Sequence, residues 1–206
     1  MNRQMFMIFL AAIVCMPSLA GTPDLLPSIT KQIEQHPVVR ADFVQTKRMI
    51  ALKRPLVSKG RMIFSRKEGV FWLIDEPIRV SYWLGDLKII EVSPDGQRKE
   101  QDTKSNPALT QISRVMRSML GAQTEALKEN FDVQARGSAT QWELDLVPKQ
   151  AQLAQYVRSI KVRGGRFIEV MTLEEVSGDT TQTHFSASEA LGEVPASDIQ
   201  RFAKTK

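Results

Sequence analysis

The sequence predicts a mainly β protein: one antiparallel sheet of about ten to eleven strands that curls into a closed or partly closed barrel, with a few helices. Short segments of alternating apolar and polar residues, separated by turn residues, fill most of the 206-residue chain. A single long helical pattern interrupts them near the middle. Sheets of this size usually curl or close, and the inserted helix would then cover an apolar interior.

The first twenty residues are expected to be a cleaved export signal. Arg3 supplies a positive start, residues 5–16 are almost wholly apolar, and Ser18 and Ala20 are small residues at the positions that cleavage after Ala20 requires. The apolar run is too short for a stable membrane span. We therefore expect residues 21–206 to form one soluble exported domain, with a retained N-terminal anchor as the alternative.

Composition narrows the classes of function. Cys15, the only cysteine, lies in the expected signal, so the mature chain would hold no disulfide, thiol nucleophile or thiolate metal ligand. The net charge of +5 falls to +4 without Arg3, and basic and acidic residues are interspersed. This pattern is typical of a solvated surface, so no nucleic-acid partner is expected.

The mature chain begins with a helical pattern and continues as strands. Leu26, Ile29 and Ile33 recur at helical spacing after a candidate N-cap at Asp24, and Pro37 ends the pattern. A first strand is predicted over residues 38–52, with Phe43 on its apolar face. Further strands are predicted near 57–66, 69–75, 79–84, 87–92 and 97–102.

The helical pattern in the middle of the chain has clear ends. Asn106 is a candidate cap, Pro107 occupies the first helical position, and Gly121 follows the last turn. A second short helix is predicted over residues 124–130. The long helix carries one broad apolar stripe, made of Leu109, Ile112, Val115, Met116, Met119 and Leu120.

Strand patterns then resume and continue almost to the C-terminus. Trp142, Leu144 and Leu146 alternate with polar residues, which indicates a sheet with one wet face. No strong pattern is found beyond residue 189. The predicted strands lie near 131–136, 140–147, 157–163, 166–174 and 180–187.

The segment 60–74 is the most informative of all. Its even-numbered residues share one face of a hairpin, because side chains alternate across a strand. That face is apolar and ends at Arg66, and a buried arginine is costly unless it is paired. A cavity with a polar latch at its mouth would use such a residue, whereas an ordinary filled core is the alternative. The apolar members are Met62, Phe64, Val70, Trp72 and Ile74.

The sequence offers little for catalysis. His36 and His184 have no partner at metal-ligand spacing, and no nucleophile or phosphate-loop motif is present. We therefore expect no enzyme activity, catalytic residue, cofactor or metal. A triad assembled only in space leaves a hydrolase as the third interpretation.

Three segments resemble the family of LolA, the periplasmic carrier of outer-membrane lipoproteins. Ala41-x-Phe43-x-Gln45 is similar to the family's first-strand pattern. Gly60-x-Met62-x-x-x-Arg66, followed by Trp72 and Pro77, matches the family's central spacing without a gap. Residues 146–149, followed by an aliphatic strand, resemble a later family segment. Lys67 stands where the family usually has proline, so this chain resembles a divergent member.

The resemblance implies a monomeric carrier with an unclosed barrel, a helical lid and a cavity for the acyl chains of a lipoprotein or related lipid. It also implies an inner-membrane donor transporter and an outer-membrane acceptor as partners. By the same resemblance Arg66 would hold the lid shut. A lipid-responsive interaction or sensor module on the same fold is the second interpretation. The residues expected to line the cavity are Phe43, Met62, Phe64, Val70, Trp72, Ile74, Leu109, Ile112, Met116, Met119, Trp142 and Leu144.

Overall fold

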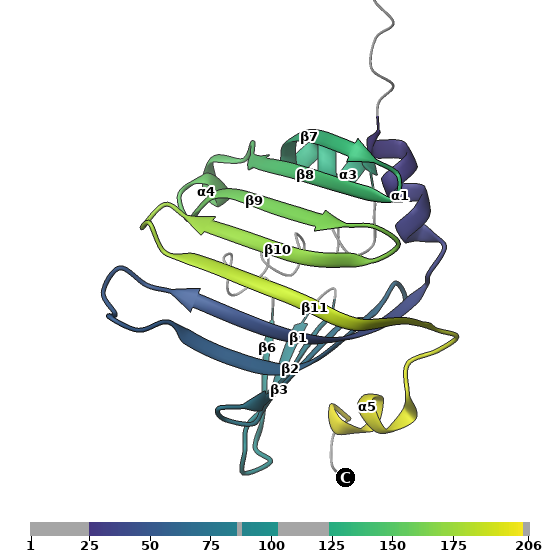
Figure 1. Ribbon diagram of the computed structural model, residues 1–206. Helices are drawn as coiled ribbons and strands as arrows, with labels where there is room; N and C mark the ends of the chain where they lie inside the picture. The colour runs from purple at the N-terminus through teal and green to yellow at the C-terminus, as the bar shows by residue number, and fades with distance from the viewer. Residues whose placement is uncertain (1–24, 86–87, 103–123, 204–206) are drawn as a thin grey trace, which may run out of the picture.

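The protein is built on one eleven-stranded antiparallel sheet that curls without closing (Figure 1). The computed structural model describes residues 25–85, 88–102 and 124–203. This architecture confirms the predicted mainly β, unclosed fold. The strands are β1 (Val38–Arg48), β2 (Leu56–Ser65), β3 (Gly69–Glu76), β4 (Val80–Leu84), β5 (Lys88–Val92), β6 (Arg98–Asp102), β7 (Phe131–Ser138), β8 (Gln141–Pro148), β9 (Val157–Gly164), β10 (Ile168–Glu175) and β11 (Thr180–Leu191).

The described helices are short and lie at the margins of the sheet. They are α1 (Leu26–Glu34), α3 (Thr124–Asn130), α4 (Ala151–Ala154) and α5 (Ala196–Arg201). Pro27 falls in the first turn of α1, where a missing N–H is tolerated, and Leu25 is the N-cap. The candidate cap Asp24 and the helix predicted between Pro107 and Gly121 lie outside the described residues. None of the helices described is both long and apolar enough to cross a membrane.

Two meanders, β1–β6 and β7–β11, meet where β1 pairs with β11. At this seam Phe43 of β1 lies opposite Phe185 of β11 on one side and Gly60 of β2 on the other. Gly60 is required by close packing, because a Cβ there would lie 1.9 Å from the carbonyl oxygen of Leu73. β1 ends at Arg48, four residues earlier than predicted, and residues 49–55 form the loop to β2.

The concave face of the sheet carries two apolar clusters that share the side chains of Ile168 and Met171. In one, α1 and α3 pack on β7, β8 and β9 through Ile29, Leu127 and Phe131. In the other, Trp72 stacks on Phe43 with ring centroids 4.1 Å apart and meets the edge of Phe185. The inner face is therefore apolar from β3 across the seam to β7. The second cluster is centred on Ala41, Phe43, Met62, Phe64, Val70, Trp72 and Phe185.

One patch of the outer face, from Val38 at the start of β1 across β2 and β3 to β5, is also apolar, and the C-terminal segment covers it. Ile63, Phe71, Leu73 and Ile90 are buried there against the side chains of Phe202 and Val194. Asp198 of α5 is buried and pairs with Arg61, with 3.1 Å between Nη2 and Oδ1. The segment after residue 189, in which no strong pattern was found, therefore contains the end of β11 and a helix that packs on the sheet.

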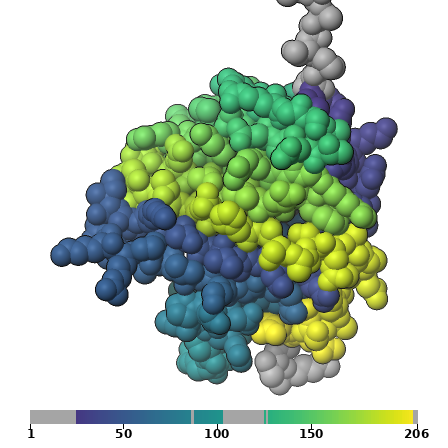
Figure 2. Space-filling model, viewed as in Figure 1, coloured from purple at the N-terminus to yellow at the C-terminus, as the bar shows by residue number. Residues whose placement is uncertain are grey.

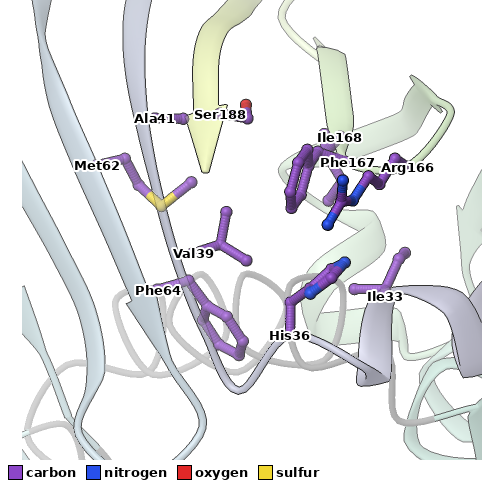
Figure 3. A pocket seen from close by; sticks show the side chains of 10 residues that line it. All are labelled: Ile33, His36, Val39, Ala41, Met62, Phe64, Arg166, Phe167, Ile168 and Ser188. Carbon is purple, nitrogen blue, oxygen red and sulfur yellow. The ribbon is translucent and has the colours of Figure 1, made fainter. Parts of the chain in front are cut away.

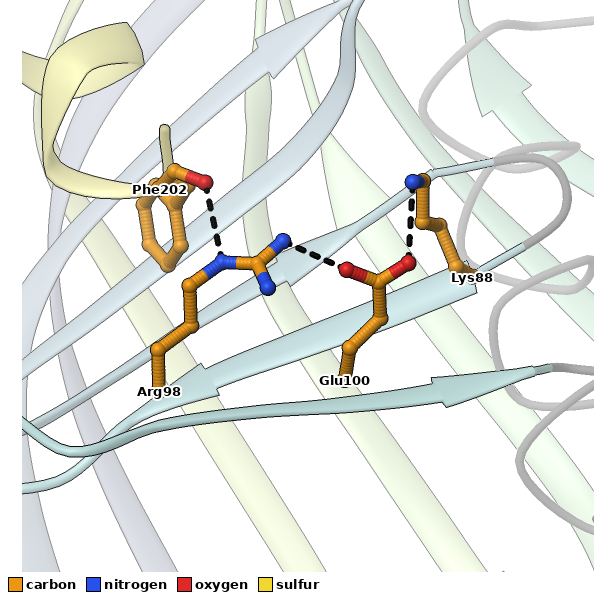
Figure 4. Close-up of polar contacts among 4 residues, drawn as sticks. All are labelled: Lys88, Arg98, Glu100 and Phe202. Carbon is orange, nitrogen blue, oxygen red and sulfur yellow. Dashed lines mark hydrogen bonds and ion pairs between the residues drawn. The ribbon is translucent and has the colours of Figure 1, made fainter. Parts of the chain in front are cut away.

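The edge strand β6 is strongly polar. Glu100 accepts hydrogen bonds from Nζ of Lys88 at 2.9 Å and from Nη2 of Arg98 at 2.6 Å (Figure 4). These two bonds lower the pKa of Glu100 to about 2. Arg98 also donates from Nε to the carbonyl oxygen of Phe202, which connects the edge to the C-terminal segment. Charged side chains on an edge strand oppose pairing with a second chain.

We predict that Phe202→Ala lowers the free energy of unfolding by about 3 kcal/mol, because the change leaves a cavity against Phe71. Ile199→Ala is the matched control, since Ile199 lies in the same segment but is 43% exposed. The control should change stability by about 0.5 kcal/mol or less. Urea unfolding followed by circular dichroism measures both, and equal losses would contradict the packing of this segment.

Candidate functional site

A pocket lies at the end of the concave face where α1 meets the sheet (Figure 3). The pocket is narrow, with a cavity volume of about 30 Å³ for a water-sized sphere. Its wall is mainly apolar, with two basic side chains and one hydroxyl. The lining residues are Ile33, His36, Val39, Ala41, Met62, Phe64, Arg166, Phe167, Ile168 and Ser188.

The pocket has two walls from distant parts of the sequence. Val39 of β1 and Met62 and Phe64 of β2 form one wall, because alternate residues of these strands point to the concave face. Phe167 and Arg166, from the turn between β9 and β10, lie opposite them (Figure 3). The pocket therefore bridges the two meanders.

The turn between β9 and β10 is held in place through one carbonyl group. The Gly165 oxygen accepts a hydrogen bond from Nε1 of Trp142 at 2.8 Å, and another from the side-chain amide of Gln32 in α1. If the turn moved, Trp142 would lose a buried hydrogen bond and Gln32 a partly buried one, and each loss would cost stability. These bonds fix the position of Phe167 and Arg166 relative to α1.

The polar part of the pocket is formed by His36, Phe167 and Arg166. The His36 and Phe167 rings lie 5.0 Å apart, and the Arg166 guanidinium carbon lies 5.3 Å from the centre of the Phe167 ring. Burial, and then the positive charge of Arg166, lower the pKa of His36 below its ordinary value. The imidazole is thus kept neutral at pH 7, and the guanidinium is the charged group of the pocket.

The sequence-predicted cavity residues fall into two groups. Met62 and Phe64 line the pocket, and Phe43, Val70, Trp72 and Ile74 lie with them in one cluster on the concave face. Trp142 and Leu144 belong to the neighbouring cluster under α1 and α3. The structure therefore places all eight on one continuous apolar face. Leu109, Ile112, Met116 and Met119 lie outside the described residues.

Arg66 lies in the turn after β2 and is exposed. Its guanidinium donates a hydrogen bond to the carbonyl oxygen of Glu34, the last residue of α1, and its backbone N–H donates to the carbonyl of Pro37 at 3.0 Å. A cation at the C-terminus of a helix also interacts favourably with the helix dipole. Arg66 therefore ties the end of α1 to the β2–β3 hairpin beside the pocket, although it does not line it.

Eight of the ten pocket residues were not among the predicted cavity residues: Ile33, His36, Val39, Ala41, Arg166, Phe167, Ile168 and Ser188. Ile33 had a signal, because it belongs to the apolar stripe of α1. Arg166 and Phe167 follow two glycines in a turn, and nothing local indicates what a turn will face. Ser188 follows Ala187, whose positive φ of 49° marks an irregularity in β11. That irregularity changes which residues point inward.

The described residues contain no group of three or more His, Cys, Asp or Glu side chains placed to hold a metal ion. His184 is exposed, and its Nε2 contacts the side-chain oxygen of Gln182 at 3.0 Å. The arrangement in the pocket suits the binding of apolar groups beside one cation.

A family model described as outer membrane lipoprotein carrier protein LolA-like matches residues 24–203. The chain belongs to this family. The match extends over both meanders and the C-terminal segment, so the whole described fold is that of a LolA-like protein. No curated protein matches the chain.

Solved structures are similar to this LolA-like protein at low sequence identity. A DUF1329 family protein from Desulfovibrio piger is 12% identical with a TM-score of 0.48, over 83% of this chain and 93% of that chain. A LolA superfamily protein from Nitrosomonas europaea is 8% identical with a TM-score of 0.45, over 87% and 96% of the two chains. The family assignment rests on the family model.

We predict that Arg166→Gln raises the pKa of His36, because the variant removes a positive charge beside the ring. An NMR titration of the His36 ring measures the shift. Arg158→Gln is the control, since Arg158 is exposed on β9 and is no part of the pocket. An unchanged titration in Arg166→Gln would show that the Arg166 charge does not act on His36.

The lowered pKa of His36 also determines the direction in which the stability of the protein changes with pH. The pKa of His36 is lower in the folded than in the unfolded chain, so its contribution to stability is fully present above about pH 6.5. That contribution is lost as the pH falls through the folded pKa. His36→Gln should therefore reduce the loss of stability between pH 7.5 and pH 5, measured by urea unfolding.

Proposed function

We propose that this LolA-like protein is a periplasmic carrier that shields the acyl chains of a lipoprotein or related lipid and moves them from the inner to the outer membrane. The observation that carries the proposal is the apolar concave face, which runs from β3 to β7 and ends in the pocket beside α1. Its family supports the carrier class. A donor transporter in the inner membrane and an acceptor at the outer membrane would complete the route.

The energetics suit reversible loading. Burying an acyl chain contributes about 0.8 kcal/mol per methylene group, so a few methylenes match the roughly 1.5–3 kcal/mol of one charged hydrogen bond. The Arg66 bond to the Glu34 carbonyl is of this kind and is further weakened by its exposure. Such a contact can act as a latch that cargo opens and that closes again on release.

The proposal is tested by purifying the protein from the periplasm without detergent and identifying bound lipid by mass spectrometry. An acylated polypeptide or a stoichiometric lipid in the extract supports a carrier. A protein partner that leaves when lipid is added would instead favour a sensor module. A lipid-free protein that takes up no acylated peptide, or one that hydrolyses it, would overturn the proposal.

We predict that Val39→Gln weakens binding of an acylated fluorescent probe about tenfold, because it places an amide in the apolar wall of the pocket. Val44→Gln is the matched control. Val44 lies in the same strand but is 41% exposed. Titration of the probe measures both affinities. Equal affinities for the two variants would remove the pocket from the binding site.

We predict that Arg66→Leu changes the rate of probe loading or release about fivefold while the circular dichroism spectrum stays native, because one exposed contact of about 1 kcal/mol is lost. Lys67→Leu is the control, because Lys67 is the next residue, and its side chain is 90% exposed. Stopped-flow fluorescence measures the rates. Unchanged rates in Arg66→Leu would exclude the latch role.

A further inference from the structure

Two hairpin tips meet at the end of the sheet opposite the pocket. The loop 49–55, between β1 and β2, lies beside the turn between β10 and β11, and both are at the left in Figure 1. The backbone N–H of Ile50 donates to Oδ1 of Asp179 at 2.9 Å, and the Ile50 side chain lies over Gly178. At about 3.3 Å per residue, β1 separates this end from the pocket by about 30 Å.

Several large apolar side chains are exposed at this end of the sheet. Ile50 is 75% exposed, Leu52 45%, Leu56 52% and Val176 46%. Tyr156 is exposed nearby, and its carbonyl oxygen accepts a hydrogen bond from the N–H of Val176. The loop 49–55, which contains Ile50 and Leu52, projects from the surface (Figure 2, blue at the left edge).

The same segment is strongly basic. Between Asp42 and Glu68 the sequence has eight lysines and arginines and no acidic residue, which departs from the interspersed charges elsewhere. Arg48, Lys53 and Arg54 flank the exposed apolar residues, and all three are exposed. Within the described chain no ion pair engages them. The nearby carboxylates are already in contact: Glu175 pairs with Lys47 at 2.9 Å, and Asp179 accepts the Ile50 N–H.

We propose that this end of the molecule, the β1–β2 tip, docks on the surface of a bilayer that contains anionic lipid. Ile50 and Leu52 would enter the headgroup region, while Arg48, Lys53 and Arg54 would contact lipid phosphates. Apolar side chains surrounded by cations bind such surfaces by combining apolar burial with electrostatic attraction. Tyr156 adds a side chain with an apolar ring and a polar tip, which suits the interface.

The shape favours a bilayer over a folded protein partner. A stable protein interface usually buries about 800 Å² on each side, which calls for a broad surface. A narrow protrusion that carries exposed apolar residues, with exposed cations next to them in the sequence, instead fits a fluid surface that it can enter. The β1–β2 tip is also remote from the pocket, so docking leaves the candidate binding site free. The inference stands apart from the proposed carrier function, because it concerns a different surface.

The test is flotation of the purified full-length mature protein with vesicles of phosphatidylethanolamine and phosphatidylglycerol, compared with vesicles of phosphatidylcholine. The anionic vesicles should bind the wild type at least about tenfold more tightly. Ile50→Ser/Leu52→Ser should weaken that binding about tenfold, and Lys53→Glu/Arg54→Glu should abolish the preference for anionic lipid. Added salt should reduce the binding, since the cations are exposed.

Ile199→Ser/Arg201→Glu is the matched control, with one exposed apolar residue and one exposed cation changed on α5. It should bind as the wild type does. Ile50→Trp adds a direct readout, because its fluorescence should shift to the blue when anionic vesicles are added. Failure of the wild type to bind either vesicle overturns the proposal, as does equal weakening in the control or an unshifted Trp spectrum. Binding to a protein partner without affinity for lipid also overturns it.

Discussion

An antiparallel sheet that curls without closing leaves a concave apolar face that the rest of the chain has to cover. In this protein α1 and α3 cover that face over β7–β9, and the aromatic side chains of Phe43, Trp72 and Phe185 pack on one another across the seam. The pocket lies where the cover by α1 ends. Among the described residues, the pocket lies on the part of the concave face that α1 and α3 do not cover.

The outer face of the sheet also has apolar side chains that must be covered, and a different part of the chain covers them. The outer surface also has an apolar patch, centred on β2, β3 and β5, and the C-terminal segment covers it with Val194 and Phe202. The single buried carboxylate there, Asp198, is paired with Arg61, which offsets the cost of burying its charge. One face is thus sealed tightly, and the other retains space beside a neutral histidine and an arginine.

The sequence predicted the strands well because most of them bury one face, so that apolar residues alternate. It also placed Met62, Phe64, Val70 and Trp72 together correctly. Helix α5 was not predicted, because a charged residue, Asp198, stands at one of its buried positions and interrupts the apolar pattern. Its burial depends on Arg61, which is 137 residues away along the chain. The arginine of the pocket is Arg166, which lies in a turn, whereas Arg66 ties down the end of α1. Local patterns report which residues are buried, and they carry no information on which turns meet.

The strand order also has a consequence for how the chain assembles. Every strand pair except β1–β11 joins neighbours in sequence, so each meander can form from nearby contacts. The seam pairs Val38 with Leu191 and Arg48 with Thr180, and it has to bring together residues more than a hundred positions apart. Closing such a long loop costs entropy before any contact repays it, which makes it the slow kind of step in folding. The two meanders should therefore form early, and the pairing of β1 with β11 that joins them should form late.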